Sequence, residues 1–477
     1  MRDHLISLAL FGGVGGVLVG LPRVPGRGGR DLRRGLAHVV SGLLATTGVL
    51  VVQDKAALLV AGALGVVLTA VCVERGWIGG VLRGSRLQDY GFVAYAVAFV
   101  VLVAWLFPQR GPIVAGLLVL ALADPVAAAV GRRIGRARVT TGFSERSVEG
   151  AVAFTVVAAA VLAVVAALHR PSPAAFAAVL LIAVTAAAVE LLAPPALDNL
   201  FVPLWVAFLF STALSSTASD APGVDWLPAL AVAGAGASAV WRFRWLDPPG
   251  AVLAFLLAAG LLVTGGWAWL APLVVFLAST SVLTKANPTD RDARGLEQTV
   301  VNGLVPALPV VGHVLVGGDW WYAAHVAIVA VACADTWASE LGRRLGGAPV
   351  SIRSLKRVGA GTSGAVSAVG LLASVVGGGL VGAVGAVAAG GWRWELFLVG
   401  VVVGPLGALV DTVLGAWAQC RYRCVACGLR QERPRHCGER GVVVAGVAGL
   451  TNERVNLVAN IAGPVLASPL LSVVGPW

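Results

Sequence analysis

The feature that most constrains the fold of this chain is the recurrence of apolar segments about as long as a membrane-spanning helix. Such a helix needs roughly 20 residues with few charges. The segments include Leu5–Leu21, Ala56–Val73, Gly91–Phe107, Val148–Leu168, Ala174–Leu192, Gly250–Trp267 and Glu395–Ala418. Only 12% of the 477 residues are charged, whereas a water-soluble domain typically carries about 25%. We therefore expect an all-α, polytopic integral membrane protein with about fourteen to sixteen transmembrane helices.

Positive charge gathers in short segments between the apolar ones. These segments are Arg23–Arg34, Arg75–Arg86, Arg132–Arg146, Arg242–Arg244, Lys285–Arg294, Arg343–Arg357 and Arg421–Arg440. The net charge of +11 then reflects the tendency of basic loops to stay in the cytoplasm, rather than binding of nucleic acid or anionic lipid. We expect a multi-pass protein of the cell membrane, with Leu5–Leu21 as a retained anchor helix because arginines follow it instead of a cleavage site.

Two stretches of similar sequence end two of the apolar segments. They are ADPVAAAVGRRIG (Ala123–Gly135) and ADTWASELGRRLG (Ala334–Gly346). Upstream of them, RGLAHVVSGL (Arg34–Leu43) resembles RGLEQTVVNGL (Arg294–Leu304) with one residue inserted. The sequence therefore predicts two homologous membrane units, residues 1–240 and 241–477.

The spacing of the two units agrees downstream of these stretches and differs upstream. Gly150 lies 26 residues after the first acid and is aligned with Gly364, 29 after the second. A further acid in an apolar setting follows each, Asp198 in the first unit and Asp411 in the second. Upstream, 82 residues separate Gly42 from the first acid, but only 32 separate the matching glycine from the second. We expect the first unit to hold extra spans there.

Asp124 and Asp335, the acids of the repeated stretch, are best explained by a functional role. On a helix, Asp335, Ser339 and Gly342 share one face, as do Asp124 and its equivalents. The G-x-x-x-G pattern in both copies is explained by helix packing, but packing does not explain the acids. An acid inside a membrane is costly unless it meets a cation, a metal or water.

The order of residue types around each acid is typical of a site for phosphoryl groups. An acid can bind a divalent metal, the following Arg-Arg pair can bind phosphate oxygens, and a Gly/Ser stretch at a helix start can offer backbone N–H groups. No Gly-Lys dipeptide occurs, so the chain has no Walker A loop. A nucleotide site would have to be built from the ends of membrane helices.

Three asparagines in the last third lie on one stripe of an apolar helix. Asn452, Asn456 and Asn460 are spaced four residues apart. Hydrogen bonding between helices and lining of a polar cavity both explain such a stripe.

Four of the six cysteines lie in one basic loop, residues 420–440. Cys424, Cys427, His436 and Cys437 offer four ligands for zinc, with Cys420 in reserve. The adjacent His and Cys make this spacing irregular, so a loop without metal is the alternative. Zinc, where bound, would fasten the loop rather than take part in chemistry.

The motifs resemble those of two related families. The first unit resembles the dolichol kinase and phytol kinase family in RRGLAHVVSG, ADPVAAAVGRRIG, ERSVEGA and VELLAPPALDNLFVPL. It departs from that family at Ala123, where Gly is usual before the acid, and at Arg146, where Lys is usual. The second unit resembles the family that includes phytyl-phosphate kinase in LEQTVVNG, ADTWASELG, GAGTSGAVS, DTVLGAWAQCRYRCVAC, HCG and TNERVN.

The resemblance implies two kinases in series in one chain. A CTP-dependent kinase would convert an isoprenoid alcohol such as phytol or geranylgeraniol to its monophosphate, and a prenyl-phosphate kinase would make the diphosphate. By motif position the catalytic acids would be Asp124, Asp198, Asp335 and Asp411, with Asp124, Asp335 and Asp411 as Mg²⁺ ligands. The residues expected to bind nucleotide and phosphate are Arg132, Arg133, Arg146, Glu149, Gly150, Asn199, Asn302, Ser339, Glu340, Arg343, Arg344, Lys356, Gly361, Thr362, Ser363, Gly364, Asn452 and Asn456, with Gln298 a weaker candidate.

Two other functions share some of these features. A secondary transporter is also built from repeats with intramembrane acids, and a membrane cytidylyltransferase uses the same nucleotide chemistry. In a transporter the acids are expected near the middle of the bilayer. Here each acid precedes an Arg-Arg pair by eight residues, about 12 Å of helix, which favours a site near the cytoplasmic surface.

Overall fold

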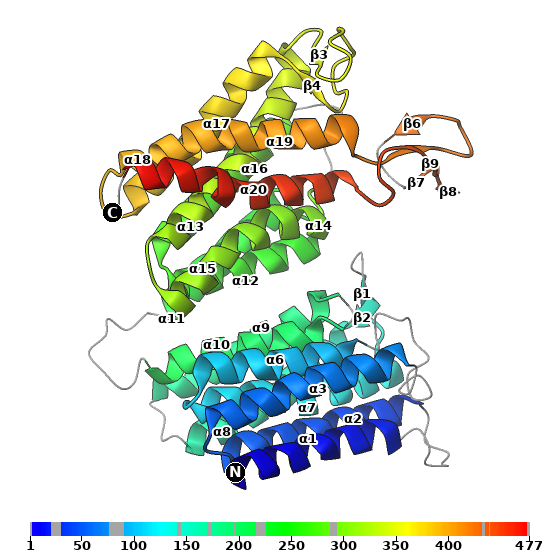
Figure 1. The fold of residues 1–477 in the computed structure, drawn as a ribbon, viewed down its shortest axis with the longest axis vertical. Helices are drawn as coiled ribbons and strands as arrows, with labels where there is room; N and C mark the ends of the chain where they lie inside the picture. Colours follow the sequence, from blue (N-terminus) through cyan, green and yellow to red (C-terminus); the bar gives the residue numbers. More distant parts are fainter. Residues whose placement is uncertain are drawn as a thin grey trace. The chain divides into compact units, whose positions relative to one another are not determined.

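The computed structural model describes most of the chain as packed helices (Figure 1). The described residues are 2–20, 30–75, 90–140, 145–168, 173–194, 196–215, 226–286, 293–431, 435–437 and 439–474. Among them, nine helices are long and apolar enough to cross a membrane, and five shorter apolar helices accompany them. The prediction of an all-α, multi-pass integral membrane protein is confirmed, while the number of spans stays a prediction.

The chain forms two compact units, Met1–Trp226 and Leu227–Trp477. The repeated motifs predicted a boundary after residue 240, whereas the contacts place it after Trp226, the first residue of helix α11 (Trp226–Arg242). The reason lies in the packing of α11, because Ala229 of this helix contacts the hydrophobic core of the second unit. Each unit has a core of its own.

Helix α7 is the centre of the first unit. It spans Arg110–Ile134, is buried almost continuously from Gly111 to Ala123, and packs against α2, α8 and α10. The other elements of the unit are α1 (Arg2–Gly20), α2 (Arg30–Val51), α3 (Lys55–Glu74), α6 (Gly91–Leu106), β1 (Arg138–Thr140), β2 (Glu145–Ser147), α8 (Val148–Leu168), α9 (Pro173–Leu192) and α10 (Asp198–Ser215). Helices α3 and α6 lie where the spacing predicted extra spans; α3 is long and apolar enough to cross a membrane, and α6 is one of the shorter apolar helices.

Helix α16 (Trp320–Leu345) has the same central place in the second unit. All its residues from Tyr322 to Ala334 are buried, and it packs against α13, α15, α17, α19 and α20. The other helices are α12 (Pro248–Thr264), α13 (Trp267–Lys285), α14 (Leu296–Thr299), the π-helical turn η2 (Val300–Leu304), α15 (Val305–Val316), α17 (Ala368–Ala388), α18 (Trp394–Leu398), the π-helical turn η3 (Val399–Val403), α19 (Gly404–Trp417) and α20 (Asn452–Val474).

The same order of elements follows the central helix in both units. In the first, α7 leads into the antiparallel strands β1 and β2 and then α8. In the second, α16 leads into β3 (Val350–Ser351) and β4 (Ala365–Val366), also antiparallel, and then α17. The repeated motif thus occupies equivalent positions in two similar helical frameworks.

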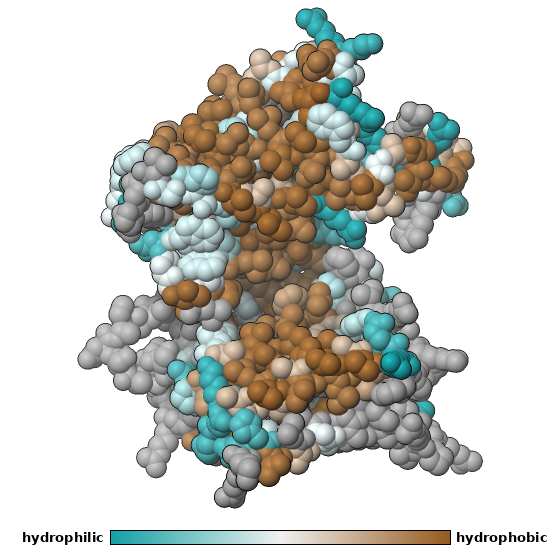
Figure 2. Space-filling model, viewed as in Figure 1, coloured by the Kyte–Doolittle hydropathy of each residue, from teal (hydrophilic) through white to brown (hydrophobic). Residues whose placement is uncertain are grey.

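Apolar side chains cover much of the outside of both units, as Figure 2 shows in brown. Exposed large hydrophobic residues lie along α3 and α8 in the first unit and along α17 and α20 in the second, for example Val67, Val156, Leu372 and Val465. Such helices place apolar side chains where a bilayer would solvate them.

Candidate functional site

Glycines set the crossing of the central helix with the helix that follows it. Ser147 precedes α8, and its hydroxyl accepts a hydrogen bond from the Gly150 N–H at 3.1 Å. A Cβ on Gly131 of α7 would lie 2.6 Å from the Ser147 Oγ. The side chain of Ser147 therefore fills the space that Gly131 leaves open, which agrees with helix packing as the role of the G-x-x-x-G glycines.

The second unit repeats this crossing with different spacing. Ser367 precedes α17 and accepts a hydrogen bond from the Gly370 N–H at 3.0 Å, and a Cβ on Gly342 would lie 3.2 Å from the Ser367 Oγ. Gly370, rather than Gly364, is therefore the structural equivalent of Gly150. The sequence alignment chose Gly364 because the loop between α16 and α17 is longer than its counterpart.

Three buried charges meet at one end of the first unit. The Arg146 guanidinium at the end of β2 forms ion pairs with Glu190 of α9 and with Asp198, the first residue of α10. The Arg146 Nη2 lies 2.7 Å from the Asp198 Oδ2, and the three side chains are 17%, 9% and 8% exposed, respectively. The sequence analysis assigned Arg146 to phosphate and missed Glu190, its partner from another helix.

Asp124 lies beside a histidine that the sequence analysis quoted only as part of a motif. Helix α2 crosses α7 so that Gly42 packs on Ala121, and one turn away the His38 Nδ1 is 4.0 Å from the Asp124 Oδ2. His38 is nearly buried, at 5% exposed. Asn199, next to Asp198, packs against Gly91 of α6, and the following residue, Phe92, contacts the His38 ring.

We call His38, Asp124, Arg146, Glu190 and Asp198 the first acid cluster. It contains three carboxylates and one guanidinium, in addition to a titratable imidazole. Burying such charges is costly unless they are paired, and Arg146 pairs with only two of the three acids.

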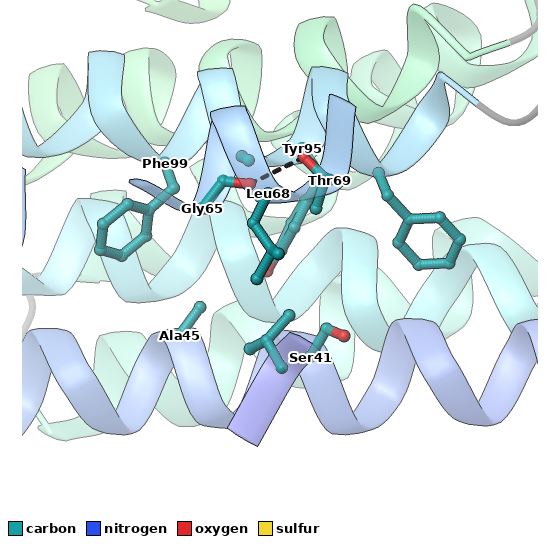
Figure 3. A pocket seen from close by; sticks show the side chains of 10 residues that line it. Ser41, Ala45, Gly65, Leu68, Thr69, Tyr95 and Phe99 are labelled. Carbon is teal, nitrogen blue, oxygen red and sulfur yellow. Dashed lines mark hydrogen bonds between the residues drawn. The ribbon is translucent and has the colours of Figure 1, made fainter. Parts of the chain in front are cut away.

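An apolar cavity of about 40 Å³ adjoins this cluster (Figure 3). Phe92 lines the cavity, and its ring lies 5.0 Å from the His38 ring. The Ser41 and Tyr95 hydroxyls, also in the lining, are buried and have no hydrogen-bond partner among the described residues. Buried hydroxyls are normally hydrogen-bonded, so this cavity suits a ligand that is mostly apolar and has few polar atoms.

In the second unit, α19, the helix that carries Asp411, packs against α16. A Cβ on Gly404 would lie 3.3 Å from Ala334 of α16. Asp411 is seven residues, two helical turns, further along the same face of α19. Asp335 directly follows Ala334, so α19 packs on α16 beside Asp335, and Asp411 lies about 10 Å further along α19.

Helix α20 brings an amide to the same region. Gly463 packs against Ala327 of α16, and Asn456 lies two turns before Gly463 on the same face of α20. With its amide oriented so that the nitrogen faces the carboxylate, Asn456 donates a hydrogen bond to the Asp411 Oδ2 at 2.7 Å. We call Asp335, Asp411 and Asn456 the second acid cluster.

A second asparagine of the predicted stripe joins α20 to the π-helical turn η2. The Asn460 Nδ2 donates to the Asn302 Oδ1 and to the Val301 carbonyl, both at 3.1 Å. Asn460 and Asn302 are buried, whereas Asn452 is exposed at the start of α20. The inserted residue of RGLEQTVVNGL coincides with η2, as expected because a π turn accommodates one extra residue in a helix.

Glu340 of α16 faces a polar group that the sequence analysis did not identify. The Arg294 guanidinium donates to the Thr280 and Thr284 hydroxyls at 2.8 and 3.2 Å, and the Thr284 hydroxyl donates to the Glu340 Oε1 at 3.3 Å. The Glu340 Oε2 is buried and has no hydrogen-bond partner among the described residues. The threonines lie on α13, outside every motif, so no local pattern pointed to them.

Most of the other predicted phosphate ligands lie outside the acid clusters or bond within the chain. The basic residues Arg132, Arg133, Arg343, Arg344 and Lys356 are exposed. The Glu149 carboxylate accepts hydrogen bonds from the backbone N–H groups of Arg136 and Ala137. Two hydroxyls donate to nearby backbone carbonyls, Ser339 to that of Thr336 and Thr362 to that of Gly359. The Ser363 hydroxyl donates to the side-chain oxygen of Gln419. Gly361 and Gly364 have positive φ angles, and Gly364 packs on Ala416 of α19. Asn199 is buried beside Gly91.

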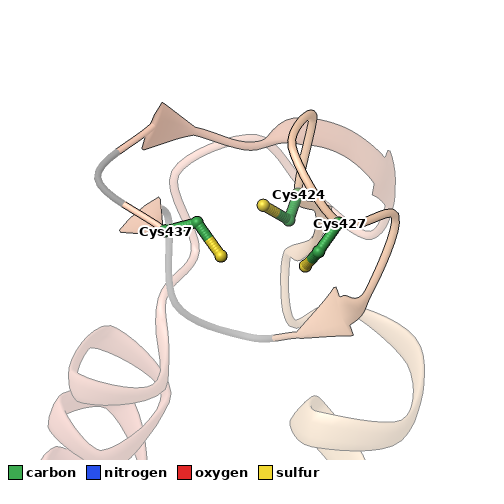
Figure 4. Close-up of side chains that lie close together, drawn as sticks. All are labelled: Cys424, Cys427 and Cys437. Atoms are coloured by element: carbon green, nitrogen blue, oxygen red, sulfur yellow. The ribbon is translucent and has the colours of Figure 1, made fainter.

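Three of the four predicted zinc ligands lie close together, and the side chain of the fourth is outside the described residues. The Cys424, Cys427 and Cys437 sulfur atoms are all within 4.8 Å of one another (Figure 4). The hydrogen bond with Cys427, desolvation and the charges of the neighbouring Cys427 and Cys424 thiolates raise the pKa of Cys437 above its ordinary value. Cys420 is buried but does not belong to this group, and the side chain of His436 lies outside the described residues.

Comparison with known proteins relates the second unit to a membrane family. Residues 231–464 match the family described as "Integral membrane protein DUF92". An "uncharacterized membrane protein" of Methanocaldococcus jannaschii is 28% identical over 232 residues, which cover 47% of this chain and 85% of that protein. No solved structure matches the chain. The second half of the chain, including its acid cluster, is therefore similar to a family of integral membrane proteins.

Proposed function

We propose that the chain is a pair of membrane phosphotransferases acting in series. The first unit converts an isoprenoid alcohol, such as phytol or geranylgeraniol, to its monophosphate, and the second converts the monophosphate to the diphosphate. CTP is the proposed donor, on the strength of the family resemblance. The observation that carries the proposal is that, in each unit, the helix with the second acid packs against the central helix that carries the motif acid.

The surroundings of the first acid cluster suit a long apolar alcohol. The chain of such a molecule partitions into the bilayer, and the cavity beside His38, about 40 Å³ and lined mostly by apolar side chains, would hold only part of the molecule. The unpartnered Ser41 and Tyr95 hydroxyls offer the few polar contacts that orient a ligand in an apolar pocket. The nucleotide would meet the exposed arginines in the last turn of α7, including Arg132.

His38 supplies a base for the first reaction. An alcohol must lose a proton as its oxygen attacks the γ-phosphorus of the nucleotide. The His38 Nδ1 faces the Asp124 carboxylate at 4.0 Å, so the other ring nitrogen would accept that proton and the imidazolium would form beside Asp124. The bond from the γ-phosphorus to the β-phosphate bridging oxygen breaks, and the nucleoside diphosphate leaves.

The second unit has Gln298 where the first has His38 in the aligned motif, RGLEQ against RGLAH. A monophosphate acceptor is already ionised at neutral pH, because the second pKa of a phosphate monoester is near 6. Its oxygen attacks without giving up a proton, so no base is required. The replacement of a histidine by glutamine therefore agrees with the order alcohol first, monophosphate second.

The residues of the second acid cluster fit Mg²⁺. This ion prefers oxygen ligands and usually binds one or two carboxylates together with phosphate oxygens, and Asp335 and Asp411 supply two carboxylates. Asp124 would be the ligand in the first cluster, because the other two acids already form ion pairs with Arg146. When bound, Mg²⁺ would neutralise phosphate charge.

The test uses the purified full chain in detergent with CTP and Mg²⁺, offered geranylgeraniol or geranylgeranyl monophosphate. Asp124→Asn should stop only the first phosphorylation and Asp335→Asn only the second. Asp319→Asn is the matched control, because this aspartate precedes the opposite end of α16 and caps no backbone group; it should keep both activities.

The products distinguish the alternative functions. A kinase releases CDP, whereas a cytidylyltransferase releases pyrophosphate and leaves CMP on the lipid. Phosphorylation of neither acceptor with CTP, ATP, GTP or UTP would overturn the proposal and make transport assays the next step.

A further inference from the structure

The loop between α19 and α20 folds into a small separate element, which we call the tab (residues 421–445). Strand β5 (Arg421–Arg423) pairs with β6 (Arg430–Gln431) and β9 (Val442–Ala445), and β7 (Arg435–His436) pairs with β8 (Glu439–Arg440). At its base, the Val447 N–H donates to the Ala418 carbonyl and the Cys420 N–H to the Leu450 carbonyl, both at 2.8 Å. The end of α19 and the start of α20 are thereby joined.

The tab has little hydrophobic core, since Tyr422 is the one large apolar side chain buried among its described residues. Val425, Leu429 and the three valines of β9 are exposed, with Val425 and Val442 each 59% exposed. An element of this size rarely folds on apolar burial alone, and small domains without a core usually depend on a metal or disulfides. Something other than apolar packing must therefore hold its hairpins together.

Three thiols lie where the two hairpins of the tab meet (Figure 4). The Cys424 N–H donates to the Leu429 carbonyl and the Gly428 N–H donates to the Cys424 carbonyl, both at 2.9 Å. Gly428 has φ +72°, a conformation that glycine adopts without strain. This turn directs Cys424 and Cys427 to the same point, and Cys437 reaches that point from the β7–β8 hairpin.

We propose that Cys424, Cys427 and Cys437 bind one zinc ion that fastens the tab. Zinc prefers thiolates in a tetrahedral arrangement, and sulfur atoms within 4.8 Å of one another can share one ion. Binding releases the three thiol protons, so three thiolates and Zn²⁺ carry one net negative charge. Arg421 and Arg423 of β5 lie in the same element and offset that charge.

The zinc acts on the second acid cluster through the helices that the tab joins. Asp411 is two turns before the end of α19, and Asn456 is one turn after the start of α20. Their hydrogen bond requires these two helix ends to keep their relative position. This consequence concerns helix positions, and the zinc site itself does not depend on the proposed phosphotransferase activity.

The experiment measures zinc in the purified full chain, prepared in detergent without chelator. Wild type should carry about one zinc per chain, and Co²⁺ added after zinc removal should give the intense near-ultraviolet bands of thiolate coordination. Cys424→Ser and Cys437→Ser should lose the zinc. Cys72→Ser, a buried cysteine of α3 in the first unit, and Cys420→Ser should keep it.

Size-exclusion profiles show whether each variant is folded. The Co²⁺ titration is done on wild type, so it tests the site even where a variant does not fold. Wild type that contains no zinc and gives no thiolate–cobalt bands would overturn the proposal. A disulfide among the three cysteines in freshly purified protein would overturn it as well, and loss of zinc from Cys420→Ser would overturn the three-cysteine ligand set.

Discussion

His38 is the residue in which the two proposed reactions differ most clearly. Its ring is nearly buried and lies between Asp124 and the Phe92 side of the cavity. A general base contributes about 10²–10⁴-fold to a reaction that requires proton removal. Gln298, its counterpart in the second unit, accepts no proton.

His38→Gln should therefore lower the rate of alcohol phosphorylation by about 10²–10⁴-fold and leave phosphorylation of the monophosphate unchanged. Steady-state rates on the two acceptors test this. His4→Gln is the control, since His4 is a half-exposed histidine that pairs with Asp54. An equal loss of both activities in His38→Gln would point to a structural role for the histidine.

Candidate site residues were predicted from the sequence where they belong to the repeated motif. Residues that contact the site from a helix far away in the sequence were missed. Asp124, Asp335 and Asp411 were chosen because repetition identified them. Glu190 was missed because its ion pair with Arg146 joins residues 44 positions apart. A charge pair between helices leaves no spacing signal in one sequence, since its distance depends on how the helices pack.

The π-helical turn η2 is the element whose geometry matters most in the second unit. Its extra residue directs Asn302 towards α20, where it accepts the Asn460 hydrogen bond. The sequence predicted one inserted residue at this point, but an insertion can equally lengthen a loop. Only the packing of α20 against η2 decides that the residue is absorbed inside the helix.

Asn460→Leu should lower the free energy of unfolding by about 1–3 kcal/mol, because the Asn302 amide oxygen would stay buried without a donor. Asn452→Leu is the matched control, being the exposed asparagine of the same stripe on α20. Thermal unfolding followed by tryptophan fluorescence compares the two. An unchanged midpoint in Asn460→Leu would mean that the hydrogen bond contributes no stability.

The cavity of the first unit makes a prediction for helix α6. Ala96 lines the cavity, whereas Ala94, also half-buried on α6, does not. Ala96→Leu should reduce kcat/KM for a C20 alcohol roughly 10-fold or more, with a smaller effect on a short-chain alcohol. Ala94→Leu should change neither value, and equal effects of the two variants would place the acceptor elsewhere.

At the scale of the whole molecule, each unit has its own hydrophobic core and its own acid cluster. The sequence predicted two units but placed α11 in the first, because an apolar helix near a boundary does not indicate which core it joins.

Residues 1–226 and 227–477, expressed as separate chains, should each fold and keep one reaction, the first unit on the alcohol and the second on the monophosphate. Size-exclusion profiles and activity assays on each half test this. A half that folds but is inactive until the other half is added would show that the reactions depend on contact between the units.

Helices α3 and α6 have a consequence for how the substrate range of such a chain can change. In the second unit, only residues 317–319 join α15 to α16, whereas in the first unit α3 and α6 stand between α2 and α7 and form much of the cavity wall. The acids lie on other helices of the first unit. Under the proposed function, selectivity for the acceptor could therefore be altered by exchanging α3 and α6, while the proposed reacting groups and the whole second unit stay as they are.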